Sequence, residues 1–174
     1  MRKAILDNLI RGIATEPPPV PDAAMRDELA RALAERARRT LGRSLSIRAV
    51  DAGSCNGCEL EIHALSNPFY DLERFGFSFV ASPRHADVLL VTGPVTKNMR
   101  EALERTYNAM PDPKWVIAVG DCAKDGGCFK GSYACCAGVS SVVPVDLHLP
   151  GCPPNPTALL KGLLALLEAG AKRG

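Results

Sequence analysis

The sequence lacks several features that would point to a particular partner or compartment. No apolar run approaches the roughly 18 residues that a transmembrane helix needs. Met1-Arg2-Lys3 is not followed by the apolar stretch and small-residue cleavage site of an export signal. The formal net charge of +2 is too small to indicate nucleic acid or an anionic membrane as a partner. We therefore expect a globular chain in the cytoplasm that binds no nucleic acid.

Cysteine, by contrast, is plentiful: the chain has seven. Structural disulfides persist mainly in oxidising compartments, so in a chain without an export signal we expect reduced thiols or metal ligands. Cys55 and Cys58 form a C-x-x-C pair just after the strand-like run 46–50. Cys122 and Cys152 each follow a strand-like run of their own, at 115–119 and 145–149. Four thiols placed after three strands are a metal-site pattern.

The first part of the chain differs from the rest. Residues 1–13 place apolar side chains on one face of a short helix, which lies against the domain or docks a partner subunit. A mitochondrial presequence is a third alternative, which the acidic Asp7 and Glu16 disfavour. The Pro-rich stretch 17–21 predicts a stiff extended linker. Asp22 is the expected N-cap of a helix over 23–41, whose apolar stripe is narrow. We assign 1–43 to a helical, Pro-rich extension that contacts other subunits.

From residue 44 to residue 174 short strands alternate with helices. Such alternation predicts an α/β domain with a parallel, doubly wound sheet and right-handed crossovers. The continuous apolar runs at 89–91 and 115–119 are typical of strands buried on both faces. Asn155 and Pro156 indicate the start of the last helix, and Gly170 its end. The expected strands are 45–51, 77–81, 87–92, 115–120 and 144–149, and the expected helices are 58–66, 68–75, 97–110 and 156–169.

The four thiols should meet, because ligands of open parallel sheets bind outside the carboxyl ends of the strands. Glycines around them, Gly57 and Gly151 included, allow the backbone to approach an inorganic sulfide closely. Structural zinc sites usually pair two C-x₂₋₄-C units, whereas this chain has one such unit and two isolated cysteines. Pro153 directly after Cys152 is typical of iron–sulfur ligand runs. An iron–sulfur cluster is therefore favoured over zinc, and a thioredoxin-like redox pair comes third.

Other polar residues have plainer interpretations. Cys128, Cys135 and Cys136 are expected to be packing or surface residues near the site. The three histidines are expected to be satisfied polar groups. Glu59 and Glu61 could carry a proton or hydrogen-bond a partner subunit, because an acid beside a buried anionic cluster should have a raised pKa. A carboxylate at a helix N-terminus is an equally natural interpretation of Glu59.

Residues 45–168 resemble the small, electron-transferring subunit of NiFe-hydrogenases and its relative in respiratory complex I. The matching stretches are Gly53-Ser54-Cys55-Asn56-Gly57-Cys58-Glu59-Leu60-Glu61, Gly120-Asp121-Cys122-Ala123-Lys124-Asp125-Gly126-Gly127 and Pro150-Gly151-Cys152-Pro153-Pro154-Asn155-Pro156. The resemblance implies a flavodoxin-like fold that holds one 4Fe–4S cluster near the active site of a separate large subunit. It implies Cys55, Cys58, Cys122 and Cys152 as ligands, the same four that the strand ends bring together. Our hypothesis is that Glu59, Glu61, Gly57, Gly151 and Pro153 surround them.

Departures from the pattern narrow the resemblance. The complex I subunit has two adjacent cysteines where this chain has Cys55-Asn56-Gly57-Cys58, which favours the hydrogenase branch. Periplasmic uptake hydrogenases have an export signal and a further cluster-binding segment, and neither is present in this sequence. The chain thus resembles the membrane-bound, energy-converting type, including the formate hydrogenlyase and hydrogenase-4 groups.

This resemblance implies a role and a set of partners. The subunit itself would make and break no bond in a substrate. Its expected partners are a hydrogenase-like large subunit, a ferredoxin-like iron–sulfur subunit and integral-membrane subunits, at the inner face of the cell membrane. Two rivals stay open: a complex I-like assembly that passes electrons to quinone, and a structural metal-binding scaffold without a redox role.

Overall fold

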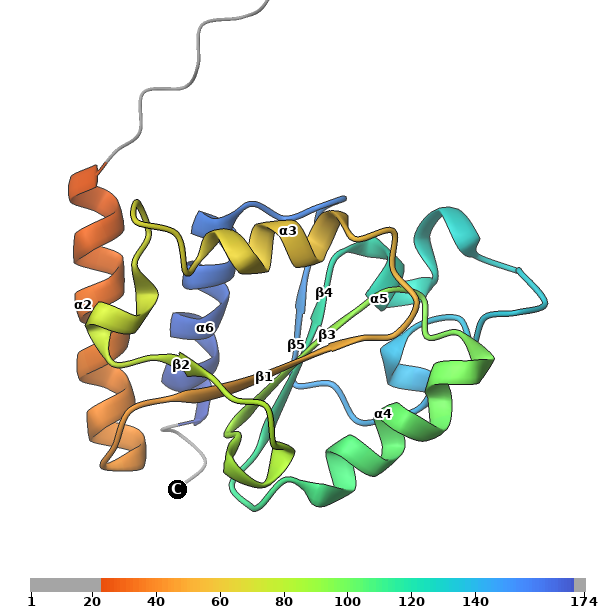
Figure 1. Ribbon diagram of the computed structural model, residues 1–174, viewed down its shortest axis with the longest axis horizontal. Helices are drawn as coiled ribbons and strands as arrows, with labels where there is room; N and C mark the ends of the chain where they lie inside the picture. Colours follow the sequence, from red (N-terminus) through yellow and green to blue (C-terminus); the bar gives the residue numbers. More distant parts are fainter. Residues whose placement is uncertain (1–22, 171–174) are drawn as a thin grey trace, which may run out of the picture.

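The computed structural model describes residues 23–170, which form an α/β fold around one five-stranded sheet (Figure 1). Every strand pairing is parallel, and the strand order is β2-β1-β3-β4-β5. This is the order of the flavodoxin-like doubly wound fold, so the predicted fold class is confirmed. The strands are β1 (Ser46–Asp51), β2 (Ser78–Phe79), β3 (Val88–Thr92), β4 (Trp115–Val119) and β5 (Leu147–Leu149).

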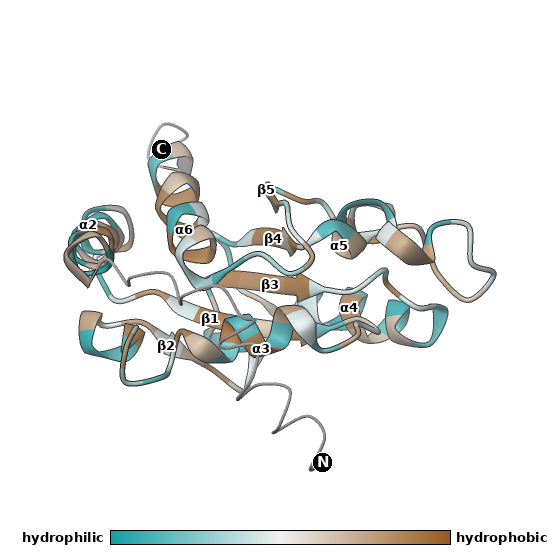
Figure 2. Cartoon of the chain, turned by 90° about the horizontal axis from the view of Figure 1, so that it is seen from above, coloured by the Kyte–Doolittle hydropathy of each residue, from teal (hydrophilic) through white to brown (hydrophobic). Residues whose placement is uncertain are grey.

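Helices cover both faces of this sheet. The core on one face includes side chains of α2, α3 and α6, and the core on the other face includes side chains of α4 and α5. Figure 2 shows the hydrophobic strands β3 and β4 between these helices. The helices are α2 (Ala23–Leu41), α3 (Gly57–Ala64), α4 (Lys97–Ala109), α5 (Asp121–Asp125) and α6 (Pro156–Gly170).

The central strands follow directly from their sequence. Every residue of β3 and of β4 is buried, as their unbroken apolar composition predicts for strands covered on both faces. Successive side chains alternate between the two cores: Leu90 and Ile117 face one, and Leu89 and Val116 face the other. The loops that follow β1, β3, β4 and β5 form the carboxyl edge of the sheet. The buried central strands support these loops rigidly.

The last helix begins as predicted. The side chain of Asn155 accepts a hydrogen bond from the backbone N–H of Ala158 at 2.8 Å, which is the geometry of an N-cap. Pro156 occupies the first helical position. Leu159, Leu160 and Leu163 are buried against the sheet. Gly170 is still helical, so the end predicted just before it is one residue short.

Three predicted elements differ clearly from the structure. The strand expected at 144–149 is shortened to β5, Leu147–Leu149. The helix expected at 68–75 is a series of turns that ends in a short 3₁₀ helix, Leu72–Phe75. Asn67 explains the turns, because its side chain accepts the backbone N–H groups of Phe69 and Tyr70, both at 2.9 Å. The strand expected at 77–81 is reduced to β2, so residues 48–51 of β1 have no strand partner on that side.

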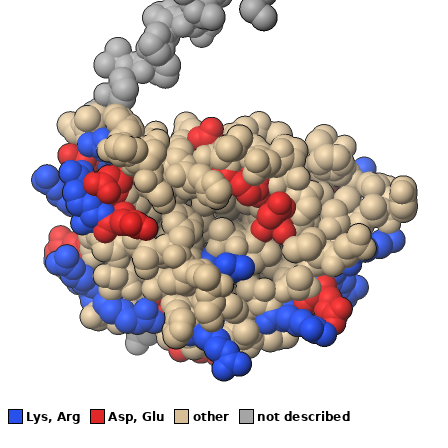
Figure 3. Space-filling view, in the orientation of Figure 1, with Lys and Arg blue, Asp and Glu red and all other residues tan. Residues whose placement is uncertain are grey.

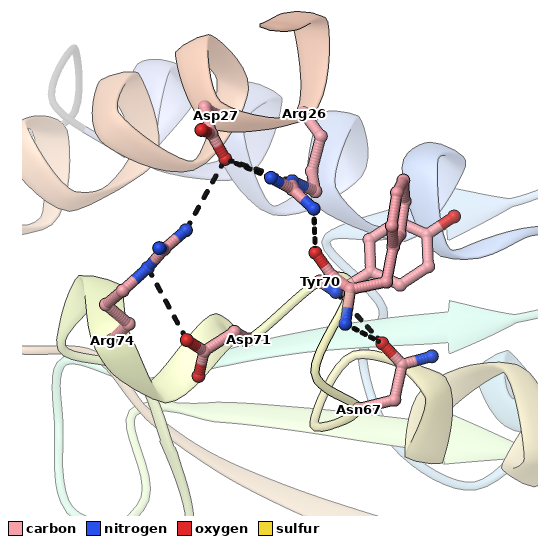
Figure 4. A network of polar contacts seen from close by, with 7 residues as sticks. Arg26, Asp27, Asn67, Tyr70, Asp71 and Arg74 are labelled. Atoms are coloured by element: carbon pink, nitrogen blue, oxygen red, sulfur yellow. Dashed lines mark hydrogen bonds and ion pairs between the residues drawn. The ribbon is translucent and has the colours of Figure 1, made fainter. Parts of the chain in front are cut away.

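Helix α2 packs within this fold. Its buried residues Leu33 and Ala37 belong to the same core as α6. Arg26 points from α2 toward the backbone carbonyl of Phe69, to which it donates a hydrogen bond, and it pairs with Asp27 at 2.7 Å (Figure 4). The predicted domain boundary at residue 43 stays a prediction. The helix expected over 1–13, the Pro-rich stretch 17–21 and the cap expected at Asp22 lie outside the described residues.

Charged side chains of both signs lie on the surface. In the view of Figure 3, Lys and Arg gather mainly on the α2 side and along the lower edge of the face. Across residues 23–170, no helix combines the length and the apolar character that crossing a membrane requires.

Candidate metal centre

The four thiols predicted as ligands line one small pocket at the carboxyl edge of the sheet. Its lining residues follow β1, β3, β4 and β5, in loops and in the first residues of α3 and α5, and they enclose about 40 Å³. Gly93, the residue directly after β3, lies here too. The lining residues are Ser54, Cys55, Gly57, Cys58, Gly93, Asp121, Cys122, Gly151, Cys152 and Pro153.

A set of local hydrogen bonds shapes the loop that carries Cys55 and Cys58. The side chain of Asp51, the last residue of β1, accepts the backbone N–H groups of Gly53 at 2.8 Å and of Ser54 at 2.7 Å. Asn56 then takes a left-handed conformation, φ 70°, which asparagine tolerates better than most residues. Helix α3 begins directly afterwards, so both cysteines flank its N-terminus.

The loops that carry Cys122 and Cys152 are bound to each other. The Asp121 side chain accepts the backbone N–H of Gly151 at 3.0 Å. In return the Asp121 N–H donates to the Gly151 carbonyl at 2.9 Å. His148 Nε2 lies 3.1 Å from the Gly120 carbonyl, which is the satisfied polar contact expected of a histidine in this chain. Asp121 was not predicted as a site residue, although it adjoins Cys122 in a matching stretch.

Glycines admit the thiols where a side chain would not fit. A Cβ on Gly120 would lie 2.8 Å from the sulfur of Cys58, and one on Gly127 would lie 2.9 Å from the sulfur of Cys122. Both glycines have positive φ, 88° and 49°. On Gly57, a Cβ would have ordinary contacts with Cys55 and Pro153. The backbone therefore approaches two of the four sulfurs closely.

The thiols influence one another electrostatically. Burial raises the pKa of the Cys58 thiol to about 12, and the charges of Glu59, Cys122, Cys55 and Cys152 act in the same direction. Burial also raises the pKa of Cys122, and the charge of Cys128 acts in the same direction. Ligand thiols in such a site hold their protons until a metal replaces them.

The two predicted glutamates lie in different surroundings. Glu59 accepts hydrogen bonds from the hydroxyl of Ser54, at 2.5 Å, and from the hydroxyl of Thr92. Thr92 is buried at the end of β3 and also donates to the Val50 carbonyl at 3.3 Å. Glu59 therefore ties α3 to the strands below it. Glu61 is half-buried on the same helix.

The thiols do not converge on a single point. Among residues 23–170, no group of three or more His, Cys, Asp or Glu side chains is arranged to hold one metal ion. The four ligands of a 4Fe–4S cluster each bind a different iron, so they surround a volume rather than a point. Cys136 packs against the core that lies on the α4 and α5 face of the sheet, and Cys135 forms a backbone bridge with Thr96.

Comparison with known proteins places these residues in a family context. The family described as "NADH ubiquinone oxidoreductase, 20 Kd subunit" matches residues 55–166, which include all four predicted ligands. A protein of Pyrococcus furiosus named "Probable membrane-bound hydrogenase subunit mbhJ" is 50% identical over 132 residues, covering 76% of this chain and 79% of that protein.

A second relative and one solved structure also match this chain. Formate hydrogenlyase subunit 7 of Escherichia coli is 50% identical over 129 residues; the match covers 72% of this chain but only 51% of that subunit. A chain in the structure of the membrane-bound sulfane sulfur reductase, an archaeal respiratory membrane complex, superposes with a TM-score of 0.67 at 36% identity. That match covers 81% of this chain and 76% of the other.

Proposed function

This chain belongs to the family of the NADH ubiquinone oxidoreductase 20 kDa subunit, and on that basis we propose that it is the electron-transfer subunit of a membrane-associated hydrogenase complex. Its relatives are subunits of oxidoreductase complexes, and two of them, both named for hydrogen metabolism, are 50% identical to it. The observation that carries the proposal is the single pocket lined by Cys55, Cys58, Cys122 and Cys152.

The donor set of this pocket fits one 4Fe–4S cluster. Four thiols are available, and the close-packed glycines leave room beside two of them. The first backbone N–H groups of α3, at Gly57 and Cys58, have no intrahelical acceptor, and a helix N-terminus favours an anionic group. When bound, such a cluster takes up and releases one electron at a time.

The residues of this chain would hold that group. The four cysteines would bind the irons, and Pro153, Gly57 and Gly151 line the pocket beside them. Glu59 would fix α3 through its bonds to Ser54 and Thr92. We assign a proton-linked role to Glu61. Unchanged turnover in Glu61→Gln would contradict that role.

The partners follow from the same proposal. An electron carrier needs a donor and an acceptor, so we infer a ferredoxin-like iron–sulfur subunit on one side and a hydrogenase-like large subunit with a NiFe site on the other. Relatives named as membrane-bound make integral-membrane subunits the anchor of the complex. The chain would then sit at the cytoplasmic face of the membrane.

The test is anaerobic purification followed by metal analysis and low-temperature EPR. We expect about four irons and four sulfides per chain, with a reduced-cluster signal that disappears in Cys122→Ser. Cys135→Ser, which changes a thiol outside the pocket, is the matched control and should keep the signal. One zinc without sulfide would overturn the proposal and leave the structural scaffold as the function.

A second candidate is quinone reduction of the complex I type. It is supported by the family match and by a further pocket of about 450 Å³ beside α3, which combines apolar and polar side chains. Ile62, Phe79 and Val80 provide its apolar part, and Arg48, His63 and Ser66 its polar part. Nickel in the copurified large subunit would select the hydrogenase, whereas quinone reduction without nickel would select this alternative.

A further inference from the structure

The carboxylate of Glu59 lies directly behind the wall of the thiol pocket. Ser54 lines that pocket, and its hydroxyl donates a hydrogen bond to Glu59 Oε2 at 2.5 Å. Ser54 directly precedes Cys55, and Glu59 directly follows Cys58. This hydrogen bond therefore joins the two ends of the segment 54–59, and both cysteines of the C-x-x-C pair lie within it.

Both oxygens of this carboxylate are held in place. While Oε2 accepts from Ser54, Oε1 accepts from the hydroxyl of Thr92 at the end of β3. The Ser54 hydroxyl is oriented in turn, because its oxygen accepts the backbone N–H of Asn56 at 3.0 Å. Glu59 is also half-buried, so its carboxylate keeps one position relative to the two cysteines.

The charge of Glu59 is not neutralised by a neighbouring cation. Across residues 23–170, no Lys, Arg or His side chain forms an ion pair with it. Its two partners are hydroxyl groups, which donate hydrogen bonds but carry no charge. The charge of a carboxylate therefore lies beside the pocket, in the first turn of α3.

A fixed charge at this place acts on any group that the thiols bind. The positive end of α3 attracts negative charge, and Glu59 offsets that attraction because it lies in the same turn. Adding an electron next to a negative charge costs electrostatic work, and this work is larger at a partly buried site than in water.

We propose that the charge of Glu59 lowers the reduction potential of the bound cluster, in addition to fixing α3. The inference rests on the function proposed above. Reduction adds one electron to the cluster and neither forms nor breaks a bond, so Glu59 acts on it only through electrostatic repulsion. The charge around a cluster is one of the quantities that set its potential. A low potential favours transfer of the electron to a site that reduces protons.

The test is EPR-monitored redox potentiometry of the anaerobic holoprotein, with dithionite as the reductant. Glu59→Gln keeps the length of the side chain and an acceptor oxygen but removes the charge, so the midpoint potential should shift to more positive values. Iron and sulfide content should not change, because Glu59 is not among the residues that line the pocket.

Two control variants separate the charge from its surroundings. Thr92→Val removes a hydrogen bond to Glu59 but keeps the charge, so it should shift the midpoint potential less than Glu59→Gln does. Glu168→Gln makes the same change of charge at an exposed residue near the end of α6, and its midpoint potential should equal that of the wild type.

The outcomes separate this inference from the proposed function. A glutamine variant with its cluster and with the wild-type midpoint potential would overturn the inference alone. An equal shift in Thr92→Val or in Glu168→Gln would also overturn it, because the charge beside the pocket would then not be the cause.

Should Glu59→Gln not hold its cluster, Glu59→Ala removes the charge without adding an amide, and the same positive shift is expected there. Loss of iron and sulfide in both variants would overturn the inference by making Glu59 necessary for binding. A wild-type protein without iron and sulfide would refute the proposed function itself, and this inference with it.

Discussion

Asp121 and Gly151 exchange two hydrogen bonds: the Gly151 N–H donates to the Asp121 carboxylate at 3.0 Å, and the Asp121 N–H donates to the Gly151 carbonyl at 2.9 Å. These residues directly precede Cys122 and Cys152. The pair therefore sets the spacing of two predicted ligands that lie 30 positions apart in the sequence.

Replacing Asp121 should loosen the site. Asp121→Ala removes the acceptor for Gly151, and residues that orient ligands typically change metal affinity about 10–100-fold. We expect faster loss of iron to a chelator, with a smaller effect in Asp121→Asn, which keeps an acceptor oxygen. Asp112→Ala, at an exposed carboxylate that is not part of the pocket lining, is the control. Equal rates of iron loss in all variants would show that Asp121 does not hold the ligands in place.

Gly120 should be intolerant of any side chain. Gly120→Ala places a Cβ 2.8 Å from the Cys58 sulfur, on a backbone with φ 88°. Gly131 offers a matched control, because its φ is 81° but no atom lies within 4 Å of the position that a Cβ would take there. Both variants should lose about 1 kcal/mol of stability from backbone strain. Only Gly120→Ala should also lose iron and sulfide, as measured per chain by metal and sulfide analysis.

Thr92 should matter for stability through Glu59. Thr92→Val keeps the shape of the side chain but removes the hydroxyl that donates to Glu59 and to the Val50 carbonyl. Leaving a half-buried carboxylate short of a donor should cost about 1–3 kcal/mol of unfolding free energy, measured by urea denaturation of the metal-free protein. Thr92→Ser restores the donor and should recover most of it. If the valine and serine variants have the same unfolding free energy, the hydroxyl does not stabilise the fold.

Helix α2 should be part of the folded core. Leu33 is fully buried, so Leu33→Ala should lower the unfolding free energy by about 2–5 kcal/mol. Met25, on the same helix but 44% exposed, is the control, and its alanine variant should stay within about 0.5 kcal/mol of wild type. A negligible effect of Leu33→Ala would favour the predicted boundary at residue 43 as a true domain boundary.

Acid should weaken the hydrogen bond and ion pairs that the Asp27 carboxylate of α2 forms. The hydrogen bond from Arg26, and then the charges of Arg26, Arg74 and Arg31, lower the pKa of Asp27 below its usual 3.8 (Figure 4). A carboxyl whose folded pKa is lowered stabilises the fold above its unfolded pKa, and this contribution is lost as the pH falls through the folded value. Asp27→Asn should therefore be less stable than wild type at pH 7 and at pH 5, with the difference shrinking below about pH 4. Urea midpoints across this range measure it.

Much of the sheet was predictable because its signals are local. The apolar runs of β3 and β4 and the cap at Asn155 need only neighbouring residues to be recognised. The helix predicted over 68–75 is wrong because a single side-chain acceptor, Asn67, favours turns over a helix. The link from Glu59 to Thr92 could not be predicted, since it depends on how α3 lies over β3. The position of Cys128 likewise depends on the direction in which a glycine-rich loop turns.

The strand order also decides when the pocket can exist. Cys55 and Cys58 follow β1, whereas Cys152 follows β5, and β3 and β4 lie between those strands. More than half of the chain separates Cys55 from Cys152, so the ligand set is incomplete until the far edge of the sheet has formed. A group bound by all four thiols would close that long loop and act as a cross-link between the two halves of the sheet. Insertion of the metal would thus be the final step of assembly, because a half-folded chain would present only part of the ligand set.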